Sequence, residues 1–580
     1  MDLQQLSGPV VVALFLLFFG TSAYIAMRIS KKTENADSYM TAGGQIGFGI
    51  SSASMTATWI WAASMYASAT SGFTYGISGP IHYGLWGALM ILLIYPFGRR
   101  IRQVAPRAHT IAEVMFARHG RSSQLLLAGS NVLGSVISLT ANLIAGGALI
   151  DMLSPFSFTQ GVVAIAGGIL LYTLWSGFRA SVLTDFVQVV FMLGAVIIII
   201  PVVFFAAGGP ELFTEGASKL TAEQRDFFSS EAFFNQGAPY IAAVLAYAIG
   251  NQTIAQRLFA VREDLIKKTF VTATFGYGST IIGVGMLGVI ALYAGITPVD
   301  NDVNNLIPQM AATYLTPALL CLFFIMIIGS LSSTADADLT ALASIVMADV
   351  YGQRVGRRNA DPAKMVLIGR ITMIVAIGAA LYFAGSNLNI LDLLVFVGAL
   401  WGALVFPVIA SFYWDRVTNV AFSVAVVAAL ALFIPVRFSW IDMAGRVGIA
   451  FDVLATIGIG VVFGLMAFGF LGKRVALIVG AVSIVAAAPW SIGFLHQYEV
   501  LSGSLISYSV STLVCVALTM LNTRRRFDFA EIAVTTGDFD DREIDPLAGS
   551  ETPVDLDDAR SDTSRDEHAV AAARLEEDPR

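Results

Sequence analysis

The chain has 580 residues, of which 56% are hydrophobic and only 13% are charged, and its mean hydropathy is +0.74. Soluble globular domains carry about 25% charged residues, so this composition excludes an ordinary soluble enzyme and predicts an integral membrane protein. The net charge of −7 is unevenly distributed: residues 527–580 hold 17 acidic residues against five Arg, whereas residues 1–526 hold 29 basic and 24 acidic residues. Two cysteines, Cys321 and Cys515, exclude a disulfide scaffold and a cysteine-based metal site. No phosphate-binding loop of the kind found in ATP-driven pumps occurs, and we expect no nucleic-acid partner.

A membrane-spanning helix needs about 20 mainly apolar residues. The hydropathy of the chain predicts fifteen such segments, near residues 8–28, 47–76, 80–98, 124–152, 158–178, 182–207, 236–260, 269–296, 315–349, 365–385, 389–413, 418–436, 449–472, 475–493 and 500–521. We interpret the first as a retained span, because it lacks a basic leader and a convincing cleavage site. The expected fold class is therefore an all-α polytopic membrane protein.

Basic residues indicate the orientation of the spans, because they accumulate on the cytoplasmic side. With the N-terminus outside and the C-terminus inside, 25 of the 29 basic residues before the tail fall at or near the inner face. Residues 527–580 are acidic, polar and poor in large apolar residues, so we expect a disordered cytoplasmic tail. A cytoplasmic partner of this tail and a solvated extension without a specific role are both open readings. The expected location is the plasma membrane.

Two spans differ from the others by their hydroxyl groups. The second carries Ser51, Ser52, Ser54, Thr56 and Thr58, and the ninth reads Ser330-Leu-Ser-Ser-Thr-Ala-Asp336-Ala-Asp338. Helix packing explains small and hydroxylated residues alone, but a carboxylate inside a span predicts a functional site. Ser330, Ser333 or Thr334, and Ala337 share one helical face. Its oxygen ligands suit a hard monovalent cation, and carbonyls freed by a break in span two would complete the shell.

Several motifs in this order give the chain its resemblance to a known family. They are Tyr172 with Ser176-Gly177-Phe178-Arg179-Ala180 and Thr184-Asp185 to Gln188, then Asn251-Gln252 with Gln256-Arg257 and Ala260, then Ser333-Thr334 with Asp349 to Tyr351. With these motifs, residues 10–470 resemble the sodium:solute symporter family. The resemblance implies a LeuT-type core of two inverted five-helix repeats and alternating access driven by sodium. The implied division of the chain is a first span and linker (1–46), repeats at 47–207 and 208–414, additional spans at 415–526 and the tail at 527–580.

The resemblance also implies the cation sites. The main sodium site would consist of the backbone carbonyls of Ala57, Ile60 and Ser330 and the hydroxyls of Ser333 and Thr334. A second site, for sodium or for a proton shared between two acids, would consist of Asp185, Ser333 and Asp336, with Asp336 where the family usually has a serine. The alternative is that Asp336 merely faces a cytoplasmic vestibule. No organic cofactor is expected, and Na⁺, or H⁺ in its place, would be the coupling ion.

The stretches Trp59-Ile60-Trp61-Ala62-Ala63 and Ala105-Pro106-Arg107-Ala108-His109-Thr110 resemble the urea active transporter branch of the family. Urea is therefore the leading solute, with proline or another small neutral or zwitterionic solute as the alternative, and a passive urea channel or a membrane sensor less favoured. The predicted solute pocket consists of Trp59, Trp61, Asn251 and Gln252, whose amides and flat rings suit a small polar solute. Arg257 and Arg370 are placed near inner span ends, which disfavours an acidic solute. His82 and His109 are interpreted as solvated or interfacial.

Overall fold

The computed structural model describes residues 3–29, 36–355, 360–386, 388, 390–438, 440–441, 445–522, 526–536 and 539. Throughout these residues the ordered elements are helices, and the one pairing of extended backbone is an isolated bridge between Ile46 and Val261. The long helices are α1 (Gly8–Ile29), α5 (Ser78–Val104), α7 (Arg121–Leu153), α8 (Phe158–Ala206), α14 (Ile266–Ala294), α16 (Pro317–Ser344), α18 (Pro362–Ala384), α19 (Ile390–Tyr413), α20 (Asn419–Arg437), α21 (Gly445–Ser491) and α22 (Glu499–Met520).

Shorter helices connect or break the long ones. They are α2 (Ala36–Thr41), α3 (Phe48–Trp59), α4 (Ala62–Tyr75), α6 (Ile111–His119), α9 (Pro210–Gly216), α10 (Ala222–Arg225), α11 (Ser230–Ala232), α12 (Ala238–Gly250), α13 (Gln252–Ala260), α15 (Leu306–Tyr314), α17 (Gln353–Val355) and α23 (Ala530–Thr535). The predicted all-α membrane fold is confirmed for the described residues. Eleven of the described helices are long and apolar enough to cross a membrane, or up to twelve if one bent pair counts as a span. The count of fifteen and the orientation therefore stay predictions.

Each of the fifteen predicted segments nevertheless coincides with helix. Two pairs of them follow one another without a connecting loop. In α8 the fifth and sixth segments meet at Gly177, and in α21 the thirteenth and fourteenth meet at Gly472, where the backbone leaves the helical conformation. The two halves of α21 pack against each other, with Gly460 close to Gly480 and Ile484. At Gly177 the backbone has φ +53°, and a Cβ atom there would lie 2.7 Å from the ring of Tyr39. Glycine is therefore required at this bend both by the backbone conformation and by the close approach of α2.

Two spans are interrupted instead of bent. Helix α3 ends at Trp59 and α4 begins at Ala62, with Ile60 and Trp61 in non-helical conformations between them. Helix α12 ends at Gly250 and α13 begins at Gln252, and the two are inclined by 53°. A break frees backbone carbonyls and amides inside the protein, where they can bind a solute or an ion.

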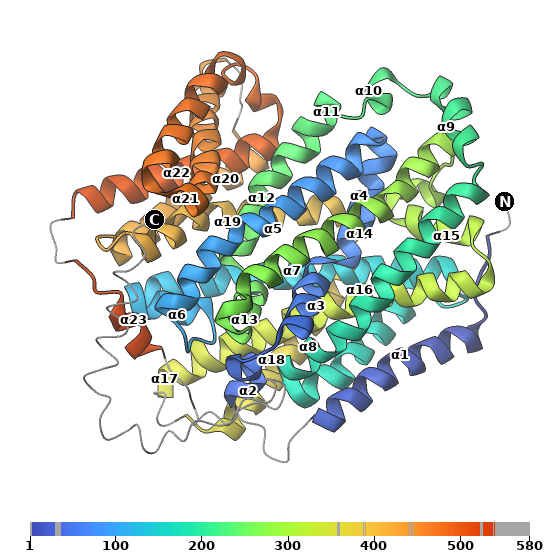
Figure 1. Cartoon of the computed structure of the whole chain (residues 1–580), viewed down its shortest axis with the longest axis horizontal. Helices are drawn as coiled ribbons and strands as arrows, with labels where there is room; N and C mark the ends of the chain where they lie inside the picture. The colour runs from blue at the N-terminus through green and yellow to red at the C-terminus, as the bar shows by residue number, and fades with distance from the viewer. Residues whose placement is uncertain are drawn as a thin grey trace.

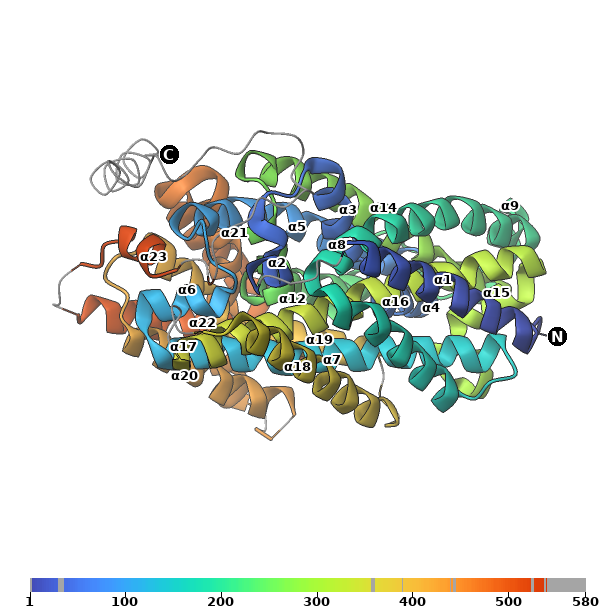
Figure 2. The same cartoon turned by 90° about the horizontal axis from the view of Figure 1, so that it is seen from below.

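Helix α16 lies within the bundle, surrounded by other helices (Figures 1 and 2). It packs against α7 and α8, and it also touches α3, α4 and α13 at the two breaks. All its residues from Met326 to Ser344 are buried. The last helices, α20, α21 and α22, pack together at one end of the molecule and contact the rest mainly through α19 (Figure 1). Helix α16 is thus the element through which both breaks are connected.

The beginning of the predicted disordered tail is folded, so that prediction is wrong for residues 527–536 and Phe539. We call residues 526–536 and Phe539 the C-terminal strap. Phe527 lies under the guanidinium of Arg118, with 4.2 Å between the charge and the ring centroid. Ile532 of α23 is fully buried, and α23 packs against α5 and α6 (Figure 1). Three apolar side chains, Phe527, Phe529 and Ile532, bury enough surface to order this short segment. The acidic residues around them make the average composition of the tail resemble that of a disordered chain. The remainder of the tail, residues 540–580, lies outside the described residues.

The strap ends at a buried histidine. The backbone N–H of Phe539 donates to Oδ1 of Asp37 at 3.0 Å, and its ring packs against His109 at 5.3 Å. Nε2 of His109 lies 2.6 Å from the same Asp37 oxygen, and Nδ1 lies 3.5 Å from Glu113. The interpretation of His109 as a solvated histidine is wrong, because its side chain is fully buried; His82 is also buried, and its Nδ1 accepts from Trp86.

Protonated His109 is expected to stabilise this end of the molecule. Burial alone lowers the pKa of His109, but Asp37 and Glu113 outweigh it and raise the pKa to about 9. Because a free histidine titrates near pH 6.5, the stabilisation is fully present below that pH and is lost as pH rises through about 9. Thermal unfolding of the purified protein should therefore show a stability loss between about pH 6.5 and pH 9 that His109→Gln removes. Parallel pH profiles for the two proteins would contradict this assignment.

Candidate functional site

The break between α3 and α4 lies directly against α16. The hydroxyl of Ser330 donates to the carbonyl of Ile60 at 2.6 Å, and both residues are fully buried. The N–H of Ile60 turns back to the carbonyls of Thr56 and Ala57, at 3.1 and 3.2 Å, so the last turn of α3 tightens before the chain leaves the helix. The carbonyl of Ile60 lies past the end of α3 and accepts its hydrogen bond from a side chain of α16. The structure thus brings Ile60 and Ser330, from the two predicted halves of the sodium site, into contact.

The remaining predicted ligands of this site lie one turn further along α16. The hydroxyl of Thr334 donates to the carbonyl of Ser330 at 3.2 Å, which is a bond within the helix. The Ser333 side chain is fully buried and faces Asp185, but among the described residues its hydroxyl makes no hydrogen bond of normal length. Buried hydroxyls are normally satisfied, so an unused one is available to bind an ion. These hydrogen bonds link Ile60, Ser330 and Thr334 in one row of carbonyl and hydroxyl oxygens, the kind of ligand that a hard monovalent cation prefers. The Ser333 hydroxyl lies on the side of Asp185 instead.

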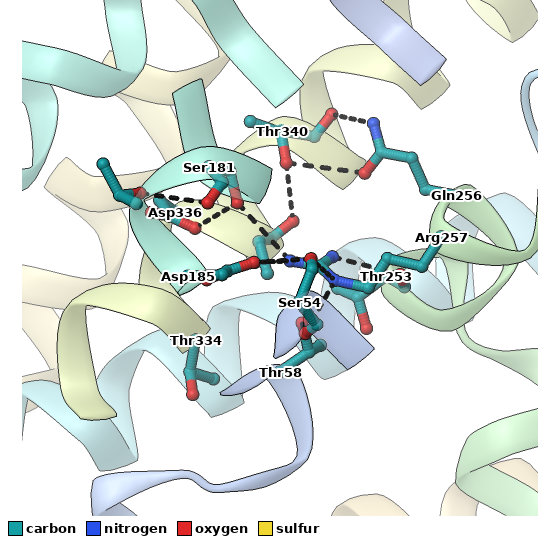
Figure 3. Close-up of polar contacts among 12 residues, drawn as sticks. Ser54, Thr58, Ser181, Asp185, Thr253, Gln256, Arg257, Thr334, Asp336 and Thr340 are labelled. Carbon is teal, nitrogen blue, oxygen red and sulfur yellow. Dashed lines mark hydrogen bonds and ion pairs between the residues drawn. The ribbon is translucent and has the colours of Figure 1, made fainter. Parts of the chain in front are cut away.

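A buried ion pair lies beside this cluster (Figure 3). Arg257 of α13 reaches Asp185 of α8, with 3.0 Å between Nη2 and Oδ2. Ser54 of α3 donates to the same carboxylate oxygen at 2.6 Å and accepts from Nε of Arg257 at 2.9 Å. The side chains of Arg257 and Asp185 are 3% and 0% exposed, so neither charge is solvated and each depends on the other. The pair joins both broken spans to α8.

The second carboxylate, Asp336, lies next to this pair. One of its oxygens accepts from Tyr172 at 2.6 Å, and the other accepts from Ser181 at 2.5 Å. Ser181 also accepts from Arg257 at 3.4 Å, so one arginine serves both carboxylates (Figure 3). Asp336 is fully buried and does not face a vestibule. The predicted second site thus has Asp185, Ser333 and Asp336 in one buried cluster, but Arg257 already supplies a positive charge there.

A third buried carboxylate, Asp338, faces the opposite side of α16. Its oxygens accept from Ser135 and Ser138 of α7 at 2.9 and 2.6 Å. The carbonyl of Ser138 in turn accepts from Asn142, whose side-chain oxygen accepts from the N–H of Ala63 at 3.3 Å. Ala63 lies in the first turn of α4. Helix α16 is therefore connected to both sides of the break, at Ile60 directly and at Ala63 through α7.

Aromatic rings enclose the other side of the break. We call Trp59, Trp61, Tyr247 and Trp401 the aromatic cluster. Tyr247 is at its centre, with ring centroids 5.3 Å from Trp59, 5.2 Å from Trp61 and 4.8 Å from Trp401. The predicted pocket residues Trp59 and Trp61 are thus brought together. Asn251 also lies near this cluster: its side-chain oxygen accepts from the hydroxyl of Thr253, which in turn contacts the hydroxyl of Tyr247.

Gln252 does not belong with the other predicted pocket residues. Its side-chain oxygen accepts from the N–H of Ile111 at 2.9 Å, and its side-chain nitrogen donates to the carbonyl of His109 at 2.9 Å. Both polar groups of the amide are therefore used to hold the loop before α6. The prediction that Gln252 contacts the solute is not supported, because the amide anchors a loop and has little capacity for further bonds.

Sequence reasoning missed Arg257 as a partner of Asp185 and Tyr247 and Trp401 as members of the aromatic cluster. Arg257 is near the end of its span, as predicted, yet it is buried there and not available as a clamp for an acidic solute. A signal was present, since an arginine and an aspartate in separate spans must each find a partner. For Trp401 the sequence offers no comparable signal, because a tryptophan in an apolar span is consistent with simple packing.

Comparison with known proteins indicates the same protein family as the sequence motifs do. The profile of the sodium:solute symporter family matches residues 39–427. The urea-proton symporter DUR3 of Oryza sativa subsp. japonica is 22% identical over 493 residues, which cover 77% of this chain and 67% of that protein. The high-affinity proline transporter PutP of Bacillus subtilis (strain 168) is 25% identical over 422 residues, which cover 70% of this chain and 86% of that protein.

A solved structure matches the fold. It is that of a Na⁺-coupled sialic acid symporter in a substrate-bound outward-open state, with a TM-score of 0.62 and 17% sequence identity, covering 82% of this chain and 97% of that chain. At this identity the likeness shows the fold alone, and the fold is the LeuT-like transporter fold that the motifs implied. The relatives and the structural neighbour are transporters and not enzymes.

Proposed function

Because the chain belongs to the sodium:solute symporter family, we propose that it is a secondary active transporter. It would import a small polar solute, most plainly urea, together with sodium, whose downhill entry drives the uptake. The observation that carries this proposal is the contact between the freed carbonyl of Ile60 and the hydroxyl of Ser330 at the α3–α4 break. A cation bound there would hold α3, α4 and α16 together, so that the ion and the solute stabilise the same arrangement.

Sodium is the proposed ion at Ala57, Ile60, Ser330, Ser333 and Thr334. Carbonyl and hydroxyl oxygens can replace the hydration shell of a monovalent cation without bringing further charge into the membrane. At Asp185, Ser333 and Asp336 the case is different, since two carboxylates share one arginine. A second sodium or a proton would neutralise the remaining charge. Family membership implies Na⁺ or H⁺ as the coupling ion, and we propose Na⁺ for the first site.

The solute is proposed to bind beside the break, between Trp59, Trp61 and Asn251. Flat rings and an amide suit a small planar polar molecule, and the pairing of Arg257 with Asp185 leaves no free positive charge there for an acid among the described residues. The likeness to the rice urea-proton symporter supports urea. The likeness to the Bacillus proline transporter, at slightly higher identity, keeps proline as the alternative.

The topology is part of the same proposal. Fifteen spans, with the N-terminus outside and the C-terminus inside, would give two inverted repeats at 47–207 and 208–414 and additional spans at 415–526. The position of the breaks supports it, because α3–α4 and α12–α13 each interrupt the first span of a proposed repeat. The protein is an integral membrane protein, and we propose the plasma membrane as its location, with the C-terminal strap on the cytoplasmic side.

Uptake into proteoliposomes with imposed gradients tests the function. We expect labelled urea to accumulate when sodium is higher outside, because entry of the ion is coupled to entry of the solute. Labelled proline in the same vesicles distinguishes the alternative solute, and a proton gradient imposed without sodium distinguishes the coupling ion. Vesicles without protein provide the baseline. Urea entry that equilibrates without accumulating, independently of either gradient, would indicate a passive channel and would refute the proposal.

A further inference from the structure

The aromatic cluster contains hydrogen-bond donors that no described residue uses. The indole N–H groups of Trp59 and Trp401 and the side-chain nitrogen of Asn251 are buried, and within the described part of the chain they have no acceptor. Trp59 is 5% exposed, Trp401 is fully buried and Asn251 is 1% exposed. A buried donor without an acceptor has lost its hydrogen bond to water without replacement, and native proteins contain few such groups. Three in one place therefore require an explanation.

These donors belong to a single cluster centred on Tyr247. The rings of Trp59 and Trp401 both lie edge-on to Tyr247, at 5.3 and 4.8 Å. The side-chain oxygen of Asn251 is fixed by Thr253, which supplies its N–H at 2.6 Å and its hydroxyl at 2.5 Å. This assignment makes the nitrogen of Asn251, and not the oxygen, the atom left for another group. The three donors come from α3, from the α12–α13 break and from α19.

The neighbouring Trp61 shows what a satisfied indole looks like in the same cluster. Its N–H donates to the carbonyl of Thr58 at 2.7 Å, and its ring also packs edge-on to Tyr247 at 5.2 Å. Packing against Tyr247 therefore does not by itself leave an indole N–H without an acceptor. Trp59 and Trp401 make the same kind of ring contact as Trp61. They differ from it because their N–H groups have no acceptor among the described residues.

We propose that Trp401 and Asn251, together with Trp59, determine the solute class by donating hydrogen bonds to a carbonyl or carboxylate oxygen of a small solute held against Tyr247. A site with donors and no free charge recognises a neutral or zwitterionic molecule by its oxygen acceptor. It discriminates against an analogue of the same shape with a weaker acceptor, because the donors would then stay unpaired. This inference rests on the proposed transport function and adds Trp401 to the solute site.

Competition between urea and thiourea tests the proposal, since the two molecules share their shape and differ in acceptor atom. Wild-type protein should bind urea more tightly than thiourea. Trp401→Phe keeps a flat ring and removes one donor, so it should weaken urea inhibition of labelled urea uptake about tenfold and leave thiourea inhibition nearly unchanged. Trp86→Phe is the matched control, because Trp86 lies outside the aromatic cluster and its N–H already donates to Nδ1 of His82 at 2.8 Å. It should leave the urea-to-thiourea ratio as in wild type. An equal ratio in Trp401→Phe and wild type would overturn the proposal.

A binding measurement separates this proposal from the proposed function. Sodium-dependent protection of the purified protein against thermal unfolding can be measured with urea, thiourea, proline and guanidinium, the last of which has no acceptor oxygen. Protection by urea or proline that Trp401→Phe loses and Trp86→Phe keeps supports the donor site, even if no uptake occurs and the transport function is refuted. Protection by guanidinium equal to that by urea, or protection unchanged in Trp401→Phe, would overturn it. If Trp401→Phe does not fold, Asn251→Asp, which replaces the donor nitrogen by an acceptor, should lose protection by urea in the same way.

Discussion

Arg257→Gln is expected to abolish solute uptake and to destabilise the protein, because it leaves the buried carboxylate of Asp185 without its counter-charge. Removing one partner of a buried ion pair costs about 3–5 kcal/mol, and both side chains here are at most 3% exposed. Thermal unfolding of the purified protein and uptake into proteoliposomes measure the two effects. The destabilisation is the larger signal, since it does not depend on the identity of the solute.

The double variant Asp185→Asn with Arg257→Gln separates the pair from other contacts of Arg257. Removing both charges should recover most of the stability lost in the single variant, as expected for two residues in direct contact. Arg262→Gln is the matched control, because Arg262 pairs with Asp264 at the same 3.0 Å but on the surface, where ion pairs contribute little. A double variant as unstable as Arg257→Gln alone would contradict the assignment of the pair.

Ser333→Ala with Thr334→Ala is expected to raise the sodium concentration for half-maximal uptake at least tenfold, about 1.4 kcal/mol. The physical reason is the loss of the two hydroxyls among the five oxygens of the proposed sodium site, with the carbonyls of Ala57, Ile60 and Ser330 left in place. The sodium dependence of labelled urea uptake measures the effect. Thr372→Ala is a suitable control, since the Thr372 hydroxyl donates to the carbonyl of Ile368 within α18, away from the break between α3 and α4. Unchanged sodium dependence in the double variant would remove both residues from the site.

Much of the fold could be predicted from the sequence, because a helix in a membrane is specified by its own hydropathy. The predicted segments coincide with helices, and the hydroxyl-rich stretch at Ser51–Thr58 indicated the unusual span. Sequence also placed Ile60 and Ser330 together, through motifs that carry information about tertiary contact. The break at Ile60 and Trp61 and the bends at Gly177 and Gly472 are decided by packing between helices, so their geometry could not be derived from local propensity.

The side-chain pairings of the site were less predictable. Gln252 lies next to Asn251 in the sequence, yet its amide holds the loop at His109 while Asn251 stays near the aromatic cluster. Which neighbour faces which partner depends on the direction in which α13 leaves the break, and no periodicity encodes that direction. The strap was missed for a different reason. The average composition of residues 527–580 is that of a disordered chain, and Phe527, Phe529 and Ile532 are too few to alter the average.

Equilibrium binding of radioactive sodium to the purified protein tests most directly whether the oxygens of the α3–α4 break and of α16 hold a cation. We expect saturable binding to wild-type protein that is strongly weakened by Ser333→Ala with Thr334→Ala and retained in Thr372→Ala. Binding of equal affinity in all three proteins, or no saturable binding to wild type, would contradict it.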